Sequence, residues 1–257
     1  MISSALQHVQ EIAGRSGRLA VFLDYDGTLT PIVSQPGQAV LSDSTRQVVR
    51  TLAAHVPVAI LSGRDLDDVR QRVNIDGIVY AGSHGFDIAG PRGLRKEVAA
   101  EFVPILDAAE KELRKKLAGI PGAWLERKRF SVAAHYRQAT ESGVAKIRQA
   151  VDETVARHHE LSRVVEKKVY ELQPDIDWNK GRAVVWLLET LGLDQPEVLP
   201  LYIGDDRTDE DAFRVLAHRG IGIVVGEQPR PTAARYALKN PAEVERFLRE
   251  LIAWLIQ

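Results

Sequence analysis

Short apolar runs alternate with amphipathic helical patterns in both outer parts of the chain, and this alternation constrains the fold more than any other feature. Leu19 to Leu23 is a continuous apolar run that ends at Asp24, and its length is typical of a strand buried on both faces. Strands followed by helices predict an α/β fold, in which a mostly parallel sheet has helices on both faces. The other predicted strands are residues 56–61, 77–81, 199–203 and 221–225, and the predicted helices are residues 45–54, 65–73, 180–191, 209–217 and 243–256.

The middle of the chain follows a different pattern. It predicts a long charged helix over residues 97–117, a hairpin over 123–137, a second helix over 142–158 and a second strand pair over 164–172. An α-ββ-α-ββ block inside a chain of alternating strands and helices predicts an inserted, smaller α+β domain. We therefore expect a core domain formed by residues 1–104 and 175–257 and an inserted domain formed by residues 105–174, with linkers near Pro104 and Pro174.

Composition excludes several kinds of chemistry and partner. The chain has 34 Lys and Arg against 35 Asp and Glu, so it lacks the basic surplus typical of proteins that bind nucleic acid. It has no cysteine, which excludes disulfides, thiolate metal sites and cysteine nucleophiles. No apolar run approaches the roughly 18 residues of a membrane-spanning helix, and the charged and polar residues among the first twenty are not the pattern expected of a signal peptide. We expect a cytoplasmic protein with no membrane partner and no obligate protein partner.

Paired carboxylates follow the first predicted strand. Asp24 and Asp26 flank Tyr25 and precede Gly27, at the sheet edge where open α/β folds bind ligands. Two such carboxylates could share a cation, or divide the roles of nucleophile and general acid–base between them. A capped turn without catalytic function is the alternative, since Asp and Gly favour turns.

Two further polar loops follow predicted strands. Ser62-Gly63-Arg64 precedes a helix, so its hydroxyl and backbone N–H groups suit a phosphate, although such turns also occur for structural reasons. The loop that contains Asp205, Asp206 and Asp209 is rich in carboxylates, which favours Mg²⁺ held by a few carboxylates, water and a substrate phosphate. Lys180, at a predicted helix start, could supply a balancing cation.

In order, spacing and strand context, these loops resemble the haloacid dehalogenase-like phosphatases, which have a Rossmann-like core and, in one class, a large α+β cap. The resemblance narrows to the trehalose-6-phosphate phosphatase family and extends over residues 19–226, cap included. The segments that carry it are DYDGTLTPI (24–32), LSGRD (61–65), AGSHG (81–85), LERKRFSVAAHYR (125–137), YELQP (170–174), NKG (179–181) and GDDRTDEDAF (204–213).

The resemblance implies Mg²⁺-dependent hydrolysis of trehalose 6-phosphate to trehalose and phosphate, the final step of trehalose biosynthesis. Asp24 would be the nucleophile that forms an aspartyl-phosphate, and Asp26 would protonate the leaving sugar and then activate water. Ser62 and Lys180 would hold the phosphoryl oxygens. Mg²⁺ would be held by the Asp24 carboxylate, the Asp26 backbone carbonyl and Asp205, and the cap would close over the site.

The resemblance also assigns sugar-binding residues. Glu126, Lys128 and Glu171 in the cap would hydrogen-bond the distal glucose, although an exposed strand face is their alternative interpretation. Arg64, His84 and Arg137 are further substrate-binding candidates, and His84 could equally be a loop histidine held by backbone groups.

Two other functions compete with this interpretation. A phosphatase for another sugar phosphate, such as sucrose phosphate or glucosyl-phosphoglycerate, would share the core motifs and differ in the cap. A non-catalytic regulatory domain would be expected to have lost a nucleophile or metal residue, whereas Asp24, Asp26, Lys180 and Asp205 are all present.

Overall fold

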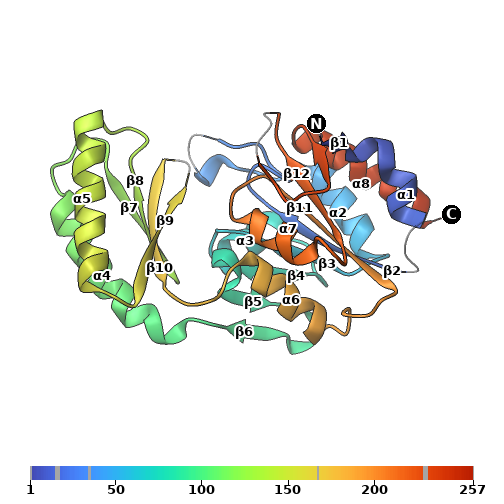
Figure 1. The fold of residues 1–257 in the computed structure, drawn as a ribbon, viewed down its shortest axis with the longest axis horizontal. Coiled ribbons are helices and arrows are strands. Elements are labelled where there is room, and N and C mark those ends of the chain that lie inside the picture. The colour runs from blue at the N-terminus through green and yellow to red at the C-terminus, as the bar shows by residue number, and fades with distance from the viewer. Residues whose placement is uncertain (1, 15–17, 34–35, 167, 228–230, 257) are drawn as a thin grey trace. The chain divides into compact units, whose positions relative to one another are not determined.

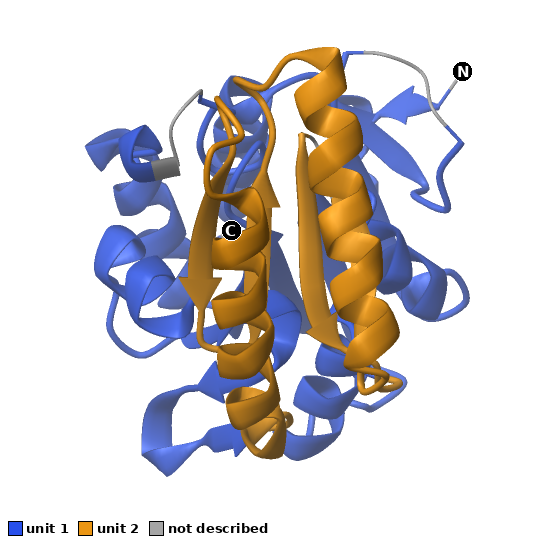
Figure 2. Cartoon of the chain, turned by 90° about the vertical axis from the view of Figure 1, so that its left-hand side faces the viewer, with its two compact units in different colours: residues 1–96, 178–257 blue, residues 97–177 orange. Residues whose placement is uncertain are grey.

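A computed structural model of the chain describes residues 2–14, 18–33, 36–166, 168–227 and 231–256. The chain forms two compact units: residues 1–96 with 178–257, and residues 97–177. Figure 2 distinguishes them by colour. The interrupted first unit is the core domain and the second is the inserted cap, so the mixed α/β fold with an inserted α+β domain is confirmed.

A nine-stranded sheet forms the centre of the core unit. The central strand β2 pairs in parallel with β11 and β3, and only the β4–β5 pair is antiparallel among the pairings described in this sheet. Figure 1 shows this sheet crossing the core unit. In sheet order its strands are β1 (Ser3–Ser4), β13 (Tyr236–Leu238), β12 (Ile221–Val225), β11 (Val198–Gly204), β2 (Arg18–Asp24), β3 (Val58–Leu61), β4 (Val79–Gly82), β5 (Asp87–Ala89) and β6 (Arg95–Glu97).

Helices cover both faces of this sheet because its central strands are apolar on both sides. Leu19, Val21 and Leu23 pack into the core on one face, with α1 (Val9–Gly14), α2 (Asp43–Ala53), α3 (Leu66–Val73) and α8 (Pro241–Leu255). Ala20 and Phe22 alternate with them and pack on the other face, with α6 (Lys180–Thr190) and α7 (Asp209–Leu216). The parallel sheet covered by helices on both faces agrees with the sequence prediction.

The cap unit has a four-stranded antiparallel sheet with one apolar face. Val132, Ala134 and Leu172 share this face and pack against two helices that lie along it, as Figure 2 shows. The sheet order is β7 (Trp124–Lys128), β8 (Ser131–His135), β10 (Val169–Pro174) and β9 (Leu161–Glu166), and the helices are α4 (Val103–Leu117) and α5 (Glu141–Arg157).

The boundaries of the units differ from those expected at Pro104 and Pro174. Pro104 lies in the first turn of α4, where proline is tolerated because the first backbone N–H groups of a helix have no intrahelical acceptor. The segment before it is not part of one long helix: it forms the short strand β6 and a 3₁₀ turn at Ala100–Phe102. Pro174 is the last residue of β10. The chain therefore enters the cap unit at residue 97 and leaves it after residue 177.

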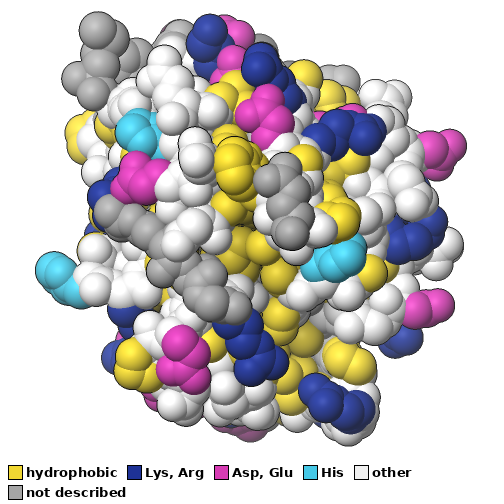
Figure 3. Space-filling view, turned by 90° about the vertical axis from the view of Figure 1, so that its right-hand side faces the viewer, with side chains coloured by type: hydrophobic (Ala, Val, Ile, Leu, Met, Phe, Trp, Pro, Cys, Tyr) yellow, Lys and Arg dark blue, Asp and Glu magenta, His cyan; other side chains and the backbone are white. Residues whose placement is uncertain are grey.

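Apolar side chains are exposed on the side of the core unit where both termini lie. Figure 3 shows them along the middle of this face, with charged residues of both signs around them. Trp254, in the last turn of α8, and Ile256, directly after this helix, are among the large apolar residues that stay exposed. Within the described ranges, the helices are too short or too polar to span a membrane.

Candidate active site

The sheet brings the polar loops to one edge of the core unit. Asp24 is the last residue of β2, whose parallel neighbours β3 and β11 end at Leu61 and Gly204. Ser62 and Asp205 directly follow those neighbours, so three separate segments of sequence meet at the carboxyl edge of the sheet. Parallel pairing thus produces the convergence that the sequence predicts.

A buried lysine joins two of the carboxylates. The Nζ atom of Lys180 lies 2.7 Å from Oδ1 of Asp24 and 2.7 Å from Oδ1 of Asp209. The lysine is the first residue of α6, and the side chain of Asn179 caps this helix by accepting a hydrogen bond from the backbone N–H of Arg182. Burial alone would lower the pKa of Lys180, but the carboxylates of Asp209 and Asp24 outweigh it and hold this pKa well above its usual value. The lysine is therefore a fixed positive charge beside Asp24.

Asp209 is held in place by several donors. Its Oδ1 atom also accepts a hydrogen bond of 2.7 Å from the hydroxyl of Tyr202, and its Oδ2 atom accepts one of 2.8 Å from the backbone N–H of Asp206. Burial raises the pKa of the Tyr202 hydroxyl, so this group remains a neutral donor. Because both oxygens of Asp209 already have partners, its main role is to orient Lys180 and the loop around Asp206.

The remaining carboxylates fit a divalent cation. Ligand atoms of Asp24, Asp205 and Asp209 all lie within 4.8 Å of one another. Among the described residues, Oδ2 of Asp24 and Oδ1 of Asp205 are buried and accept no hydrogen bond. Burial, together with the neighbouring carboxylates and against the opposing charge of Lys180, raises the pKa of Asp24 to about 7 and that of Asp205 to about 9. Oxygen ligands with excess negative charge suit a hard cation such as Mg²⁺.

Glycine allows these carboxylates to approach one another. Gly27 has a φ of +89°, and a Cβ atom there would lie 2.1 Å from Oδ2 of Asp205. A Cβ atom at Gly204 would lie 2.3 Å from Cγ of Asp209. A side chain at either position would displace a carboxylate, so the glycines define the size of the site.

Asp26 is paired with Arg64. Its two oxygens accept hydrogen bonds of 2.6 and 2.7 Å from Nε and Nη2 of the guanidinium group. A third contact, of 2.9 Å, joins Nη1 of Arg64 to Asp68 on α3. Arg64, a substrate-binding candidate from the sequence, thus contacts the predicted acid–base residue in this structure.

Ser62 lies in a loop that is supported by the next strand connection. Its hydroxyl accepts a hydrogen bond of 3.1 Å from the backbone N–H of Arg64, and its carbonyl accepts one of 2.9 Å from the backbone N–H of His84. His84 is buried in a left-handed conformation, with a φ of +57°. A Cβ atom at Gly63 would lie 2.7 Å from Cε1 of His84, so the ring packs directly on that glycine. The position of His84 gives it at least a supporting role for the Ser62 loop.

The cap residues predicted to bind sugar share the face of their sheet opposite the helices. Glu126 and Glu171 both pair with Ala133 on β8, so they lie on the same face. Nζ of Lys128 lies 2.9 Å from Oε1 of Glu171, and the hydroxyl of Ser131 donates to the same oxygen. Glu171 is fully buried, so its carboxylate is a fixed acceptor.

Glu126 has a separate partner in the cap. Its Oε2 atom lies 2.9 Å from Nε2 of His135, and this hydrogen bond is the main reason that its pKa is lower than usual. The ring of His135 stacks on the ring of Trp124, with 3.8 Å between the centroids. Arg137 is exposed in the turn after β8 and does not join either pair.

The sequence interpretation did not assign roles to Tyr202, Ser131, His135 or Trp124. Tyr202 lies inside the apolar strand β11, and nothing in the local pattern distinguishes its hydroxyl from a core residue. Ser131 and His135 were detectable only through the strand alternation of the hairpin, because they share a face with Glu126 and Lys128.

Comparisons with known proteins agree with one another. A family model described as trehalose-phosphatase matches residues 22–242. The probable trehalose-phosphate phosphatase D of Arabidopsis thaliana is 41% identical over 266 residues, which cover 98% of this chain and 72% of that protein.

Solved structures show the same fold. The C-terminal domain of the C. albicans trehalose-6-phosphate phosphatase is 24% identical, with a TM-score of 0.83 and 98% of both chains covered. The C-terminal domain of the Candida albicans trehalose synthase regulatory protein also matches, at 14% identity and a TM-score of 0.73, covering 98% of this chain and 99% of that one. A protein described as regulatory therefore has this fold too, and function has to be argued from the site residues.

Proposed function

This chain belongs to the trehalose-phosphatase family and is a phosphatase, and from that premise we propose that it hydrolyses trehalose 6-phosphate to trehalose and phosphate with Mg²⁺. The buried Asp24–Lys180–Asp209 cluster carries this proposal more than any other feature. It places a carboxylate, a fixed cation and the Asp205 carboxylate at one sheet edge, and both Asp24 and Asp205 keep a buried oxygen without a hydrogen-bond donor.

Asp24 is the nucleophile in the proposed reaction. A carboxylate oxygen forms a bond to phosphorus while the bond from phosphorus to the sugar oxygen breaks, and the leaving oxygen takes a proton from Asp26. Water then attacks the phosphorus of the aspartyl-phosphate and gives a proton back to Asp26, and the bond between phosphorus and Asp24 breaks. Lys180 and Ser62 bind the phosphoryl oxygens and lower the cost of the negative charge in the transition state.

The ion pair between Asp26 and Arg64 affects the role of Asp26 as the general acid in the proposed reaction. Both oxygens of Asp26 accept hydrogen bonds from Arg64, so this pairing competes with the contact that Asp26 makes with the leaving sugar oxygen. A substrate phosphate offers Arg64 an alternative oxyanion of the same bidentate geometry. Arg64 therefore exchanges Asp26 for substrate, which makes the acid available when a phosphate is present.

Asp24, Asp205 and the Asp26 backbone carbonyl would hold Mg²⁺, and Asp209 would support them. When bound, the cation offsets the repulsion between an anionic nucleophile and a dianionic phosphate. The two buried oxygens without donors support this assignment, because a bound cation would be their partner. The raised pKa of Asp24 and Asp205 agrees with it, because burial and neighbouring carboxylates disfavour the charged forms, which a cation would stabilise.

The cap determines which sugar phosphate the enzyme selects. Lys128 and Glu171 give one hydrogen-bonding pair and Glu126 with His135 gives another, on a single polar sheet face. Charged groups whose positions are fixed discriminate strongly between sugars, because a substrate that lacks the matching hydroxyl leaves them without a partner. Arg137 lies outside these pairs, so its assignment to the sugar rests on the family resemblance alone.

Phosphate release under Mg²⁺ tests the proposal. We expect trehalose 6-phosphate to be hydrolysed much faster than sucrose 6-phosphate, glucose 6-phosphate and glucosyl-phosphoglycerate. Preference for another substrate in this panel would retain the Asp24 chemistry and overturn the choice of sugar. Absence of release from every substrate would favour the regulatory alternative.

A further inference from the structure

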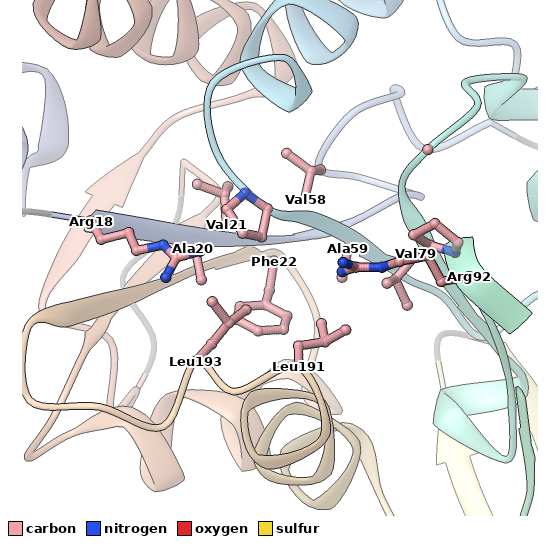
Figure 4. A pocket seen from close by; sticks show the side chains of 13 residues that line it. Arg18, Ala20, Val21, Phe22, Val58, Ala59, Val79, Arg92, Leu191 and Leu193 are labelled. Atoms are coloured by element: carbon pink, nitrogen blue, oxygen red, sulfur yellow. The ribbon is translucent and has the colours of Figure 1, made fainter. Parts of the chain in front are cut away.

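A pocket of about 180 Å³ opens at the opposite edge of the core sheet from Asp24. It lies where β2, β3 and β4 begin, and Figure 4 shows its lining. Arg18 and Asp24 are the first and last residues of the seven-residue strand β2, so they are separated by roughly 20 Å at about 3.3 Å per residue. The pocket is therefore distinct from the candidate active site.

Small side chains create the space in this pocket. Ala20 and Phe22 lie on the same face of β2, and Phe22 pairs with Ala59, which in turn pairs with Val79. The two alanines leave room beside the ring of Phe22 that larger residues would fill. Leu193, in the segment after α6, lies across from Phe22 in Figure 4 and completes the apolar lining.

Two arginines frame this apolar floor. Figure 4 shows the guanidinium groups of Arg18 and Arg92 pointing inward from opposite sides of the pocket. Across the described part of the chain, neither side chain makes an ion pair or a hydrogen bond. Two like charges that face one space without an acidic partner favour an anion between them.

We propose that this pocket binds a small organic oxyanion, a phosphate-type or carboxylate group attached to an apolar body. The oxyanion would accept hydrogen bonds from Arg18 and Arg92, since guanidinium groups match oxyanions in a bidentate manner. The apolar body would fill the space beside Phe22 and Leu193 and gain van der Waals contacts with them. An inorganic anion gains only the first of these contributions, so the site selects an amphipathic ligand of small size.

Methyl NMR on the full chain tests this proposal with phenylphosphonate, whose carbon–phosphorus bond is not the phosphate ester that the enzyme hydrolyses. We expect saturable shifts of the methyl groups of Val79, Leu191 and Leu193, separate from any shift of Leu61 beside the candidate active site. Benzoate is the second probe. The probe that binds with the higher affinity shows whether the pocket prefers a phosphate-type group or a carboxylate. Inorganic phosphate should shift the pocket methyl groups only at concentrations well above those needed for phenylphosphonate.

Substitutions of Arg18 and Arg92 test whether the probes bind in this pocket. Arg18→Gln and Arg92→Asn should each weaken the binding of phenylphosphonate about tenfold, and asparagine suits the left-handed φ of +58° at position 92. Arg70→Gln removes an exposed charge from α3 and should leave binding unchanged. All three variants should release phosphate from trehalose 6-phosphate at the wild-type rate.

Three results would overturn the proposal. One is that neither probe shifts the pocket methyl groups. Another is that the Arg18→Gln and Arg92→Asn variants bind phenylphosphonate as tightly as the Arg70→Gln control. The third is that inorganic phosphate shifts the same methyl groups with equal affinity, which would exclude the contribution of an apolar body.

Discussion

The core and the cap both gather carboxylates beside a lysine, but the balance of charge differs between them. At the sheet edge of the core, ligand atoms of Asp24, Asp205 and Asp209 lie within 4.8 Å of one another, and Asp24 and Asp209 share the ammonium group of Lys180. In the cap, Lys128 pairs with Glu171 and Glu126 pairs with His135. A cluster of carboxylates needs a cation and suits phosphoryl transfer. Ion pairs whose positions are fixed suit the recognition of a substrate. We propose that the two units divide chemistry from substrate selection.

The largest effect is expected at the nucleophile. Asp24→Asn keeps the shape of the side chain and removes its nucleophilic oxygen, so turnover should fall by at least about 10⁴-fold. The measurement is phosphate release from trehalose 6-phosphate at saturating substrate. Asp67→Asn, on the exposed surface of α3, is the matched control and should keep wild-type turnover. Full activity in Asp24→Asn would refute the assignment of chemistry to the core.

Removal of divalent cations should have the next largest effect. EDTA should lower turnover by more than about 10²-fold, because it leaves the carboxylates of the core without a counter-ion, and added Mg²⁺ should restore the activity. The melting temperature should rise with Mg²⁺, since the cation binds the folded protein only. A Glu171→Gln variant should respond to Mg²⁺ as the wild type does, because Glu171 lies in the cap unit and pairs with Lys128. Activity that persists in EDTA would contradict the claim that the carboxylates of the core need a divalent cation.

Breaking a cap pair should reduce selectivity. Lys128→Met removes the ammonium group that pairs with the buried Glu171, so we expect the preference for trehalose 6-phosphate over sucrose 6-phosphate to fall about tenfold. The free energy of unfolding should also fall by about 2 kcal/mol, as Glu171 then retains fewer hydrogen-bond partners. Both are measured by steady-state kinetics and urea denaturation. Glu160→Gln, which changes an exposed residue of the same unit, is the control. If Lys128→Met kept the wild-type preference, Lys128 would have no part in sugar recognition.

The smallest effect concerns the support of the core cluster. Tyr202→Phe removes the hydroxyl that donates to Asp209 and leaves Lys180 as the donor to the same oxygen. We expect turnover to fall roughly threefold to tenfold and stability to fall by about 1 kcal/mol. Tyr80→Phe is a matched control, because its buried hydroxyl donates to the carbonyl of Ile75 in the other apolar core. An equal loss of turnover in both variants would show that the effect is only structural.

The fold and the core site were predictable from the sequence where short-range patterns determine them. The apolar run before Asp24 indicated a buried strand, and the parallel pairing of β2 with β3 and β11 then brought distant loops to one edge. The short strands β1, β5, β6 and β13 were not predicted. They have two or three residues each, too few to show a periodic pattern.

Contacts between residues far apart in the sequence could not be predicted from the sequence pattern. The ion pair of Arg64 with Asp26 joins side chains that follow different strands, and the donor to Asp209 is a tyrosine inside a buried strand. The cap face was partly predictable, because strand alternation places Glu126 and Lys128 together. The pairing of Lys128 with Glu171 required the register of β10 on β8, which no local signal specifies.

The division between chemistry and recognition is tested most directly by one kinetic comparison. The value of kcat/KM should be measured for trehalose 6-phosphate and for p-nitrophenyl phosphate, in the wild type and in Glu171→Gln, with Mg²⁺ present. We predict that the substitution lowers the value for trehalose 6-phosphate about 10²-fold and changes that for p-nitrophenyl phosphate by less than about twofold. An equal loss for both substrates, or no loss for either, would contradict the assignment of sugar recognition to the cap.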